Sequence, residues 1–240
     1  MEKYVEMLRA GAKELGLDID REKAGEFLHY MEMLIHWNKK INLTAITHRD
    51  GIVTKHFLDS LTCAATGLVD SSLKAVDIGT GAGFPGIPLK IVYPGLEMTL
   101  IDSLRKRVQF MERVVLELGL SGISVLHGRA EDAARSDIHR ERYDLCLSRA
   151  IAHLSVAGEY CLPFVKTGGS FIAMKGPGYL DEIREAGRAI GLLGGEITDT
   201  MKFKIPFTDI THYIIIIRKT KSTGAEYPRK AGRPAKYPLR

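Results

Sequence analysis

Three glycines at alternate positions, Gly79, Gly81 and Gly83, follow an apolar run over residues 75–78. Glycine adopts backbone angles that other residues avoid, and its lack of a Cβ lets the main chain approach a ligand closely. A buried strand, a glycine loop and a helix start in succession predict a ligand-binding loop. A dinucleotide-binding loop needs a glycine at its sixth position, which is Phe84 here, so the spacing excludes that class of site.

The alternating glycines, with Asp77 just ahead of them, resemble the S-adenosylmethionine loop of Rossmann-like methyltransferases. The alternative is a structural strand-to-helix turn that binds nothing. Asp102 favours the first interpretation, because it ends the next expected strand, over residues 97–101, and lies 23 residues beyond Gly79. At this distance a carboxylate in nucleotide-binding units accepts hydrogen bonds from ribose hydroxyls. A role for Asp102 as the N-cap of the following helix is the alternative.

Two further strands are expected to end at the same edge of the sheet. The loop after residues 123–126 contains Glu131, and an acid there can accept a hydrogen bond from an adenine amino group. Residues 143–147 form the next expected strand, which aims Arg149 at the site. Because ligands of open α/β sheets bind at the carboxyl ends of the strands, both side chains are candidates for ligand contact. An ordinary surface arginine is the alternative for Arg149.

His56 and Asp59 stand three residues apart, so a helix would place them on one face. They are expected either to form hydrogen bonds at the start of that helix or to contact substrate or cofactor. Three cations at residues 105–107 open the helix after Asp102, where they oppose the helix dipole. They either contact RNA phosphates or form a solvated face.

The composition excludes several classes of protein. With 240 residues, 45% of them hydrophobic and 26% charged, the chain is long enough for one α/β core with an additional layer or a small appended domain. Its apolar runs are too short for a membrane span of about 20 residues, and the start lacks an apolar signal core, so we expect a cytoplasmic location. Cys63, Cys146 and Cys161 form no CxxC pair, and the histidines have no paired spacing, which predicts neither a disulfide nor a metal site.

The net charge of +5 is concentrated at the C-terminus. Residues 218–240 hold eight Lys or Arg against the single acid Glu226, which gives +7 and leaves −2 for the other 217 residues. A short polycationic segment attracts phosphates through counterion release, so nucleic acid is the expected partner. The prolines of this segment disfavour a helix and predict an extended arm over the surface or RNA.

The N-terminal part is expected to be helical. Helical spacing of apolar residues predicts amphipathic helices over residues 1–17 and 21–38, with Asp20 as the N-cap of the second. They are expected to pack on one flank of the sheet. The polar segment 37–47 is predicted to be a loop folded against the rest of the chain through Trp37.

Strands and helices alternate through the rest of the chain, which predicts an α/β fold with a mostly parallel sheet. The last two strands, over residues 198–203 and 212–217, are close in sequence and should form an antiparallel hairpin at the sheet edge. The chain is thereby divided into an N-terminal helical extension over residues 1–72, a catalytic domain over 73–218 and a basic C-terminal arm over 219–240.

Together these segments resemble the glucose-inhibited division protein B family, the bacterial 16S rRNA guanine-N7 methyltransferases called small-subunit methyltransferase G. The matching residues occur in the family's order from Trp37 to the C-terminus, which makes the match more specific than a glycine loop alone. They are Trp37-Asn38, Asn42-Leu43-Thr44, His56, Asp59-Ser60-Leu61, the segment 76–86, Asp102-Ser103, Lys106-Arg107, Ser148-Arg149-Ala150, Lys175-Gly176 and Tyr227-Pro228-Arg229-Lys230.

The resemblance implies a Rossmann-like class I methyltransferase with S-adenosylmethionine as cofactor and a seven-stranded sheet preceded by helices. Its substrate would be guanine 527, in the usual numbering, of 16S rRNA in the small ribosomal subunit, and we expect a monomer. The family pattern implies cofactor contacts at Gly79, Phe84, Ala130, Glu131 and Arg149. With the residues inferred above, the expected cofactor site consists of Gly79, Gly81, Gly83, Phe84, Asp102, Ala130, Glu131 and Arg149.

Methyl transfer to guanine N7 would need no catalytic base, because N7 carries a lone pair and has no proton to lose. No catalytic residue is therefore expected, and Arg149, Lys175 and His56 are candidates for positioning the substrate. Phe84 or Trp37 could stack on the unpaired guanine. A small-molecule methyltransferase and a non-catalytic RNA-binding scaffold are the alternatives, although the first has no use for a basic arm.

Overall fold

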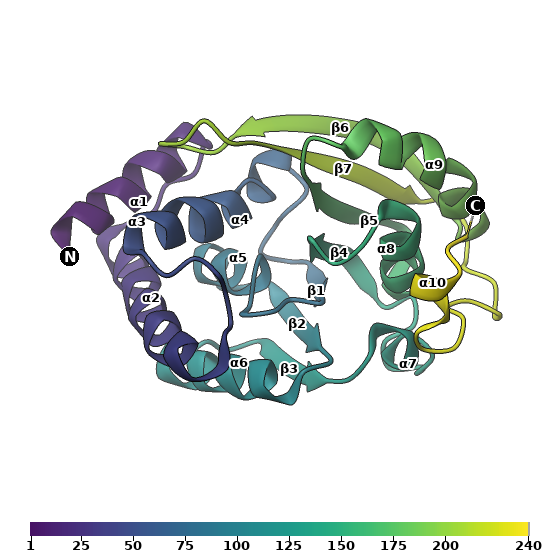
Figure 1. Cartoon of the computed structure of the whole chain (residues 1–240), viewed down its shortest axis with the longest axis horizontal. Helices are drawn as coiled ribbons and strands as arrows, with labels where there is room; N and C mark the ends of the chain where they lie inside the picture. The colour runs from purple at the N-terminus through teal and green to yellow at the C-terminus, as the bar shows by residue number, and fades with distance from the viewer. Residues whose placement is uncertain (240) are drawn as a thin grey trace.

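The computed structural model describes residues 1–239 and contains a seven-stranded sheet with helices on both faces (Figure 1). The strand order is β3-β2-β1-β4-β5-β7-β6; β1 to β5 are parallel, and β7 is antiparallel to both β5 and β6. This confirms the expected sheet and its edge hairpin. The strands are β1 (Lys74–Ile78), β2 (Glu97–Asp102), β3 (Ile123–His127), β4 (Tyr143–Arg149), β5 (Val165–Lys175), β6 (Gly195–Lys204) and β7 (Thr211–Lys219).

Alternate side chains of the central strands face two separate apolar cores. In β7, Ile214 and Ile216 belong to one core, and Ile215 and Ile217 belong to the other. Both faces of the sheet are buried under helices, which is why these strands are continuous apolar runs rather than alternating ones. The larger helices are α1 (Glu2–Glu14), α2 (Arg21–Ile41), α5 (Gly86–Val92) and α6 (Arg105–Glu117) over the first core, and α8 (Leu154–Cys161) and α9 (Tyr179–Leu192) over the second.

The helix α2 begins where the sequence predicts and ends later. The Asp20 side chain accepts a 2.8 Å hydrogen bond from Lys23 N, which confirms it as the N-cap. The helix continues to Ile41, so the expectation of a loop from residue 37 is wrong at its start. The Trp37 ring packs 5.7 Å from that of Phe110, and this contact on the core side stabilises a helical turn whose other residues are polar.

A second helical stretch follows and contacts α1 and α5. It comprises α3 (Arg49–Ile52), the π-helix η1 (Val53–Leu58) and α4 (Asp59–Leu61), with the short 3₁₀ helix η2 (Ala64–Thr66) after it. Turns of π-helix are rare in proteins, and those that occur often lie at functional sites. The extra residue in such a turn changes the direction in which the neighbouring side chains point. The remaining short helices are α7 (Ala130–Ala133), η3 (Leu162–Phe164) and α10 (Arg233–Lys236).

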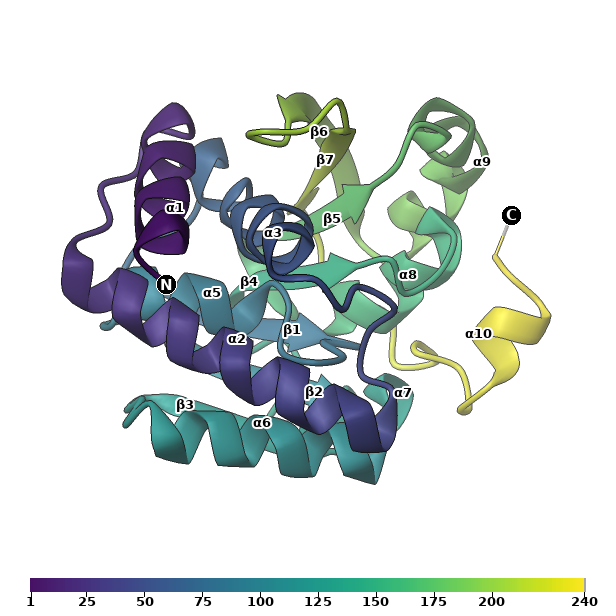
Figure 2. The ribbon, with the colours of Figure 1, turned by 60° about the vertical axis from the view of Figure 1, so that its left-hand side comes forward.

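The C-terminal arm lies at the opposite end of the molecule from α1, beside α7 and α8 (Figure 2). It is extended as expected except at α10, which the prolines were expected to prevent. That expectation is wrong because Pro234 occupies the first turn of α10, where a missing N–H costs no hydrogen bond. The Arg140 guanidinium fixes the base of the arm by donating to the carbonyl oxygens of Thr223, Gly224 and Tyr227.

Part of the arm's positive charge is neutralised inside the protein. Arg229 donates to both oxygens of the fully buried Glu159, with its Nη2 2.6 Å from Oε2, and Lys219 is buried 2.9 Å from Glu141. The eight cations of the segment are therefore not all available to RNA. The cations of the arm that the structure describes as exposed are Lys221, Lys230, Arg233 and Lys236.

Among residues 1–239, no helix combines the length and the apolar character that crossing a lipid bilayer requires. The first strand begins at Lys74 and the last ends at Lys219. The division of the chain at residues 72 and 218 stays a prediction.

Replacement of Glu159 by alanine is expected to release the arm. Arg229 loses the carboxylate that holds its backbone N–H and its guanidinium, and hydrogen bonds to charged groups contribute about 1.5–3 kcal/mol each. We expect a lower free energy of unfolding and faster tryptic cleavage at Arg229 and Lys230. The matched control is Glu226→Ala, which removes an exposed carboxylate from the same arm. Equal protease resistance of the two variants would show that Glu159 does not anchor the arm.

Candidate active site

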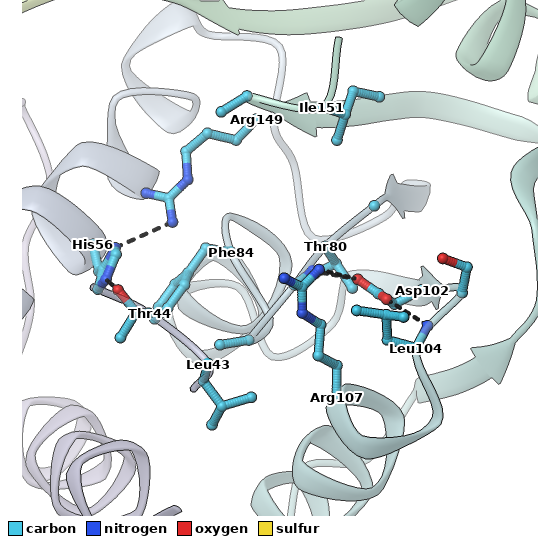
Figure 3. A pocket seen from close by; sticks show the side chains of 15 residues that line it. Leu43, Thr44, His56, Thr80, Phe84, Asp102, Leu104, Arg107, Arg149 and Ile151 are labelled. Atoms are coloured by element: carbon cyan, nitrogen blue, oxygen red, sulfur yellow. Dashed lines mark hydrogen bonds and ion pairs between the residues drawn. The ribbon is translucent and has the colours of Figure 1, made fainter. Parts of the chain in front are cut away.

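A cavity of about 510 Å³ opens at the carboxyl ends of β1, β2 and β4 (Figure 3). Its walls come from the glycine loop, the start of α6, the end of β4 and the segment around η1. The residues that line it are Leu43, Thr44, His56, Gly79, Thr80, Gly81, Ala82, Phe84, Asp102, Ser103, Leu104, Arg107, Arg149, Ala150 and Ile151.

The glycine loop is closed by the buried carboxylate of Asp77. Its Oδ2 accepts hydrogen bonds from Thr80 Oγ1 at 2.7 Å and from Gly86 N at 2.9 Å, while Oδ1 has no partner among the described residues. Burial raises the pKa of Asp77 to about 7. From α2, the Tyr30 hydroxyl donates to the carbonyl oxygen of Ala82. Asp77 therefore shapes the loop from beneath and does not line the cavity.

All three glycines of the loop have positive φ angles, as expected from their spacing: 66° at Gly79, 66° at Gly81 and 99° at Gly83. Their surroundings differ. A Cβ on Gly81 would meet nothing within 4 Å and would project into open space at the cavity. A Cβ on Gly83 would lie 2.4 Å from Ile87 Cδ1, so this glycine serves the packing of the loop on α5 and is not part of the cavity lining.

Asp102 is not the N-cap of α6, which is Leu104, but its side chain binds the backbone on both sides of the cavity. Its Oδ1 accepts from Leu104 N at 2.8 Å, immediately before α6, and its Oδ2 accepts from Gly81 N at 2.9 Å. Arg107 lies 3.4 Å from Oδ2. Asp102 also lines the cavity, and a carboxylate oxygen can accept more than one hydrogen bond. The end of β2 is thereby joined to the glycine loop.

A smaller cavity of about 160 Å³ adjoins the first and shares Gly79, Asp102, Ser103 and Ile151 with it. Ala130 and Glu131 line this second cavity. The Glu131 carboxylate is buried and accepts a 2.8 Å hydrogen bond from Gly232 N of the C-terminal arm. The sequence gives no signal for this contact, because it joins residues 101 positions apart.

Arg149 is held in the first cavity by a carboxylate that is almost completely buried. Its Nη1 donates to Asp59 Oδ2 at 2.9 Å, and its Nη2 lies 3.3 Å from Nδ1 of His56 (Figure 3). The guanidinium also lies over the Phe84 ring, 4.9 Å from its centroid. From β7, Nδ1 of His212 lies 2.6 Å from Asp59 Oδ1. Asp59 thus binds a cation with each oxygen when His212 is protonated.

The tautomer of His56 follows from its partners. Arginine stays protonated, so it donates to Nδ1, and Nε2–H donates to Thr44 Oγ1 at 2.8 Å. Burial, and then the charge of Arg149, lower the pKa of His56 to about 3. The hydrogen bond with Asp59 raises the pKa of His212. His56 is neutral near pH 7, and its interactions are with the cavity wall rather than with a helix start.

The structure separates some of the predicted site residues from the rest. Lys175 does not line the first cavity; it ends β5 and lines a neighbouring one. Trp37 packs against Phe110 and lines none of these cavities. Phe84, predicted as a stacking partner of the guanine, is 4% exposed, and its ring stacks with the rings of His56 and Tyr30. Protein side chains therefore already take the stacking positions beside this ring.

The sequence predicted most of the remaining residues but not their partners. The first cavity brings together His56, Gly79, Gly81, Phe84, Asp102 and Arg149. No sequence pattern indicated that Asp59 is the counter-ion of Arg149 or that His212 contacts Asp59. Residues 1–239 contain no group of three or more His, Cys, Asp or Glu side chains placed to hold a metal ion, and the three cysteines are buried and free.

The sheet order and the site at its carboxyl edge define the class I fold of S-adenosylmethionine-dependent methyltransferases. Solved structures with low sequence identity share this fold. A structure of TYW2 from M. jannaschii in complex with AdoMet has a TM-score of 0.54 at 13% identity, covering 72% of this chain and 77% of that one. A putative sarcosine dimethylglycine methyltransferase from Galdieria sulphuraria has a TM-score of 0.51 at 14% identity, covering 68% and 83%.

Sequence comparison narrows the class to a family. The family model described as rRNA small subunit methyltransferase G matches residues 23–211. Proteins of that name are 48% identical in Alkaliphilus oremlandii, over 98% of both chains, and 46% identical in Clostridium botulinum, over 99% of both. The chain belongs to the rRNA small subunit methyltransferase G family, as its motifs predicted.

The buried, neutral state of His56 predicts a pH dependence of stability. Its pKa is about 3 in the folded state and about 6.5 when unfolded, so the unfolded chain binds an additional proton as the pH falls between these values. This lowers the free energy of unfolding by about 2 kcal/mol at pH 5. His56→Gln should remove that loss in urea titrations at pH 8 and pH 5, and the exposed His36→Gln should not. An unchanged pH dependence in His56→Gln would contradict the assignment.

Proposed function

We propose that this enzyme transfers the methyl group of S-adenosylmethionine to N7 of guanine 527, in the usual numbering, of 16S rRNA, and that it acts as a monomer. The observation that carries the proposal is the junction of the glycine loop with Asp102 in one cavity, in a chain of this family. The relatives from Alkaliphilus and Clostridium are rRNA small subunit methyltransferases, which supports a ribosomal RNA as the substrate.

The two adjoining cavities suit the parts of the cofactor. The loop at Gly79 and Gly81 offers backbone without side chains to the methionine part, and Asp102, which lines both cavities, accepts hydrogen bonds from the ribose hydroxyls. Ala130 and Glu131 in the second cavity hold the adenine, whose amino group donates to the Glu131 carboxylate. Arg149 completes the wall on the side of β4.

The chemistry requires positioning more than proton transfer. The sulfonium of the cofactor supplies an activated methyl group when bound. The side chains of the cavity hold the guanine in line and exclude water, and such positioning contributes about 7–11 kcal/mol in favourable intramolecular reactions. The product guanine is positively charged. The salt bridge to Asp59 neutralises Arg149, so this cation does not oppose the charge that develops at N7.

Exposed cations on two sides of the site are suited to RNA phosphates. Arg105 and Lys106 are exposed at the start of α6, beside the cavity residue Leu104. The arm presents Lys230, Arg233 and Lys236 beside the second cavity, because Gly232 is bound to Glu131 there. A small-molecule methyltransferase would have no use for these cations.

Replacement of Gly81 by leucine tests the cofactor loop. The added side chain projects into the cavity, so kcat/KM for methyl transfer from labelled S-adenosylmethionine to 16S rRNA or 30S subunits lacking the modification should fall at least about 100-fold, a loss of about 3 kcal/mol. The wild-type enzyme should give one N7-methylguanine, mapped by mass spectrometry. Comparison of the two substrates identifies whether free rRNA or the assembled subunit is methylated.

The control is Gly119→Leu, because Gly119 has a similar φ of 62° and open space at its Cβ position but follows α6 away from the cavities. Both variants carry the same kind of backbone strain. Comparable activity of Gly81→Leu and Gly119→Leu would contradict the proposed cofactor site. If the wild-type protein binds the cofactor and labels no RNA, the acceptor is a small molecule and the proposed substrate is wrong.

A triple alanine variant at Lys230, Arg233 and Lys236 tests the arm. The KM for RNA should rise, and the slope of log KM against log salt should fall by about 1 for each phosphate that the variant no longer binds, while the Kd for S-adenosylmethionine stays unchanged. The control is a triple alanine variant at Lys3, Lys13 and Lys23, on helices at the other end of the molecule (Figure 1). An equal effect of both variants would mean that the arm has no specific role.

A further inference from the structure

A third cavity, of about 610 Å³, lies next to the proposed cofactor site. It is bounded by the ends of β4 and β5, by His212 of β7 and by Glu182 in the first turn of α9. Arg149, Ala150 and Ile151 line both this cavity and the first one, so the two cavities adjoin at this short segment. Ala150 has a φ of 53°, a conformation that residues with a Cβ rarely adopt, and its side chain takes up little space where the two cavities adjoin.

The far wall of this cavity carries a lysine and a glutamate in contact. Lys175 Nζ donates to Glu182 Oε2 at 2.6 Å and to the carbonyl oxygen of Ala152 at 2.5 Å, and its side chain is only 7% exposed. Glu182 Oε2 also accepts from Leu154 N at 2.7 Å. Lysine has three donors, so one N–H of Lys175 remains, and no described residue donates to Glu182 Oε1. The pair presents one donor and one acceptor side by side.

We propose that this cavity holds the target guanine and that Lys175 and Glu182 recognise its Watson–Crick edge. The inference rests on the proposed function. N7 must touch the methyl group directly, at the place beside Ala150 where the two cavities share their lining, and this turns the Watson–Crick edge toward the opposite wall. There, O6 accepts from the remaining N–H of Lys175, and N1–H and the N2 amino group donate to Glu182 Oε1. An unpaired base recognised on this edge is typical of single-stranded RNA sites.

The same pair discriminates against adenine. Adenine carries an amino group at position 6 and an acceptor at N1, so its donor would face the Lys175 ammonium and its lone pair would face the Glu182 carboxylate. Partly buried groups with mismatched hydrogen-bonding partners reject a ligand strongly. The positive charge of the N7-methylated product makes N1–H and the N2 amino group stronger donors, so their hydrogen bonds to the Glu182 carboxylate strengthen in the product.

Removing single groups from the base tests the assignment. We would assemble by ligation 16S rRNA with inosine, which lacks the N2 amino group, at the target position. For the wild-type enzyme, kcat/KM should fall about 10- to 100-fold from guanosine to inosine. In Glu182→Gln, whose amide is a weaker acceptor, the ratio between the two RNAs should shrink several-fold toward 1. Asp181→Asn is the matched control, because Asp181 is exposed in the same helical turn and pairs with Arg184.

A structural role of Glu182 would change both substrates equally, and partial unfolding of a variant cancels in the ratio. A second, independent variant is Lys175→Met, for which the ratio between guanosine and 2-aminopurine riboside should likewise shrink. This base lacks O6 and also the N1 proton, so the ratio should stay above 1 through the contact with Glu182. Equal use of guanosine and inosine by the wild-type enzyme, or wild-type ratios in both variants, would overturn the inference while leaving the proposed function intact. Absence of any methylation of guanosine RNA by the wild-type enzyme would instead refute the proposed function.

Discussion

The site depends on one carboxylate placed where water cannot reach it. Asp77 is fully buried in β1, and its Oδ2 is hydrogen-bonded to Thr80 and Gly86 on the two sides of the glycine loop. An ionised group in this position costs free energy unless polar groups surround it, and the raised pKa of Asp77 reflects that cost. The loop turns back over β1 to supply these donors, and the turn sets where α5 begins and where Gly81 faces the cavity.

Other carboxylates near the strand ends act in a similar way, because at least one oxygen of each is hydrogen-bonded to another part of the protein. Asp102 fixes Gly81 and Leu104, and Glu131 fixes Gly232 of the arm. Asp59 holds Arg149 in the cavity and contacts His212. Rigid placement of charged groups before a ligand arrives lowers the reorganisation needed during a reaction. In this way the cavities acquire both polarity and order without a metal-binding cluster in the described part of the chain.

The sequence predicted which residues around the glycine loop would share a cavity, because its signals there are local. Gly79, Gly81 and Asp102 follow from spacing within a strand, a loop and the next strand, and strand ends that share a sheet edge must converge. The partners of Arg149 could not be predicted in this way. Asp59 is 90 residues from it in sequence, and the contact of Asp59 with His212 spans 153 residues, so neither leaves a periodic pattern. The prediction of a loop at Trp37 was wrong for a related reason, since a polar turn of helix with one partly buried ring has the composition of a loop.

The residues that the sequence could predict and those that it could not lie on different sides of the proposed reaction, the side of the methyl donor and the side of the methyl acceptor. Structures that share the fold at 13 to 17% identity show how little of the sequence the sheet itself requires. The glycine loop and the carboxylate after the next strand shape the proposed cofactor side, and both lie in short segments that a sequence pattern can describe. The proposed acceptor side combines the end of β4, the end of β5, α9 and β7, which are joined by tertiary contacts alone. Recognition of a particular base on that side therefore requires the folded structure, and a change of substrate can arise there while the glycine loop stays the same.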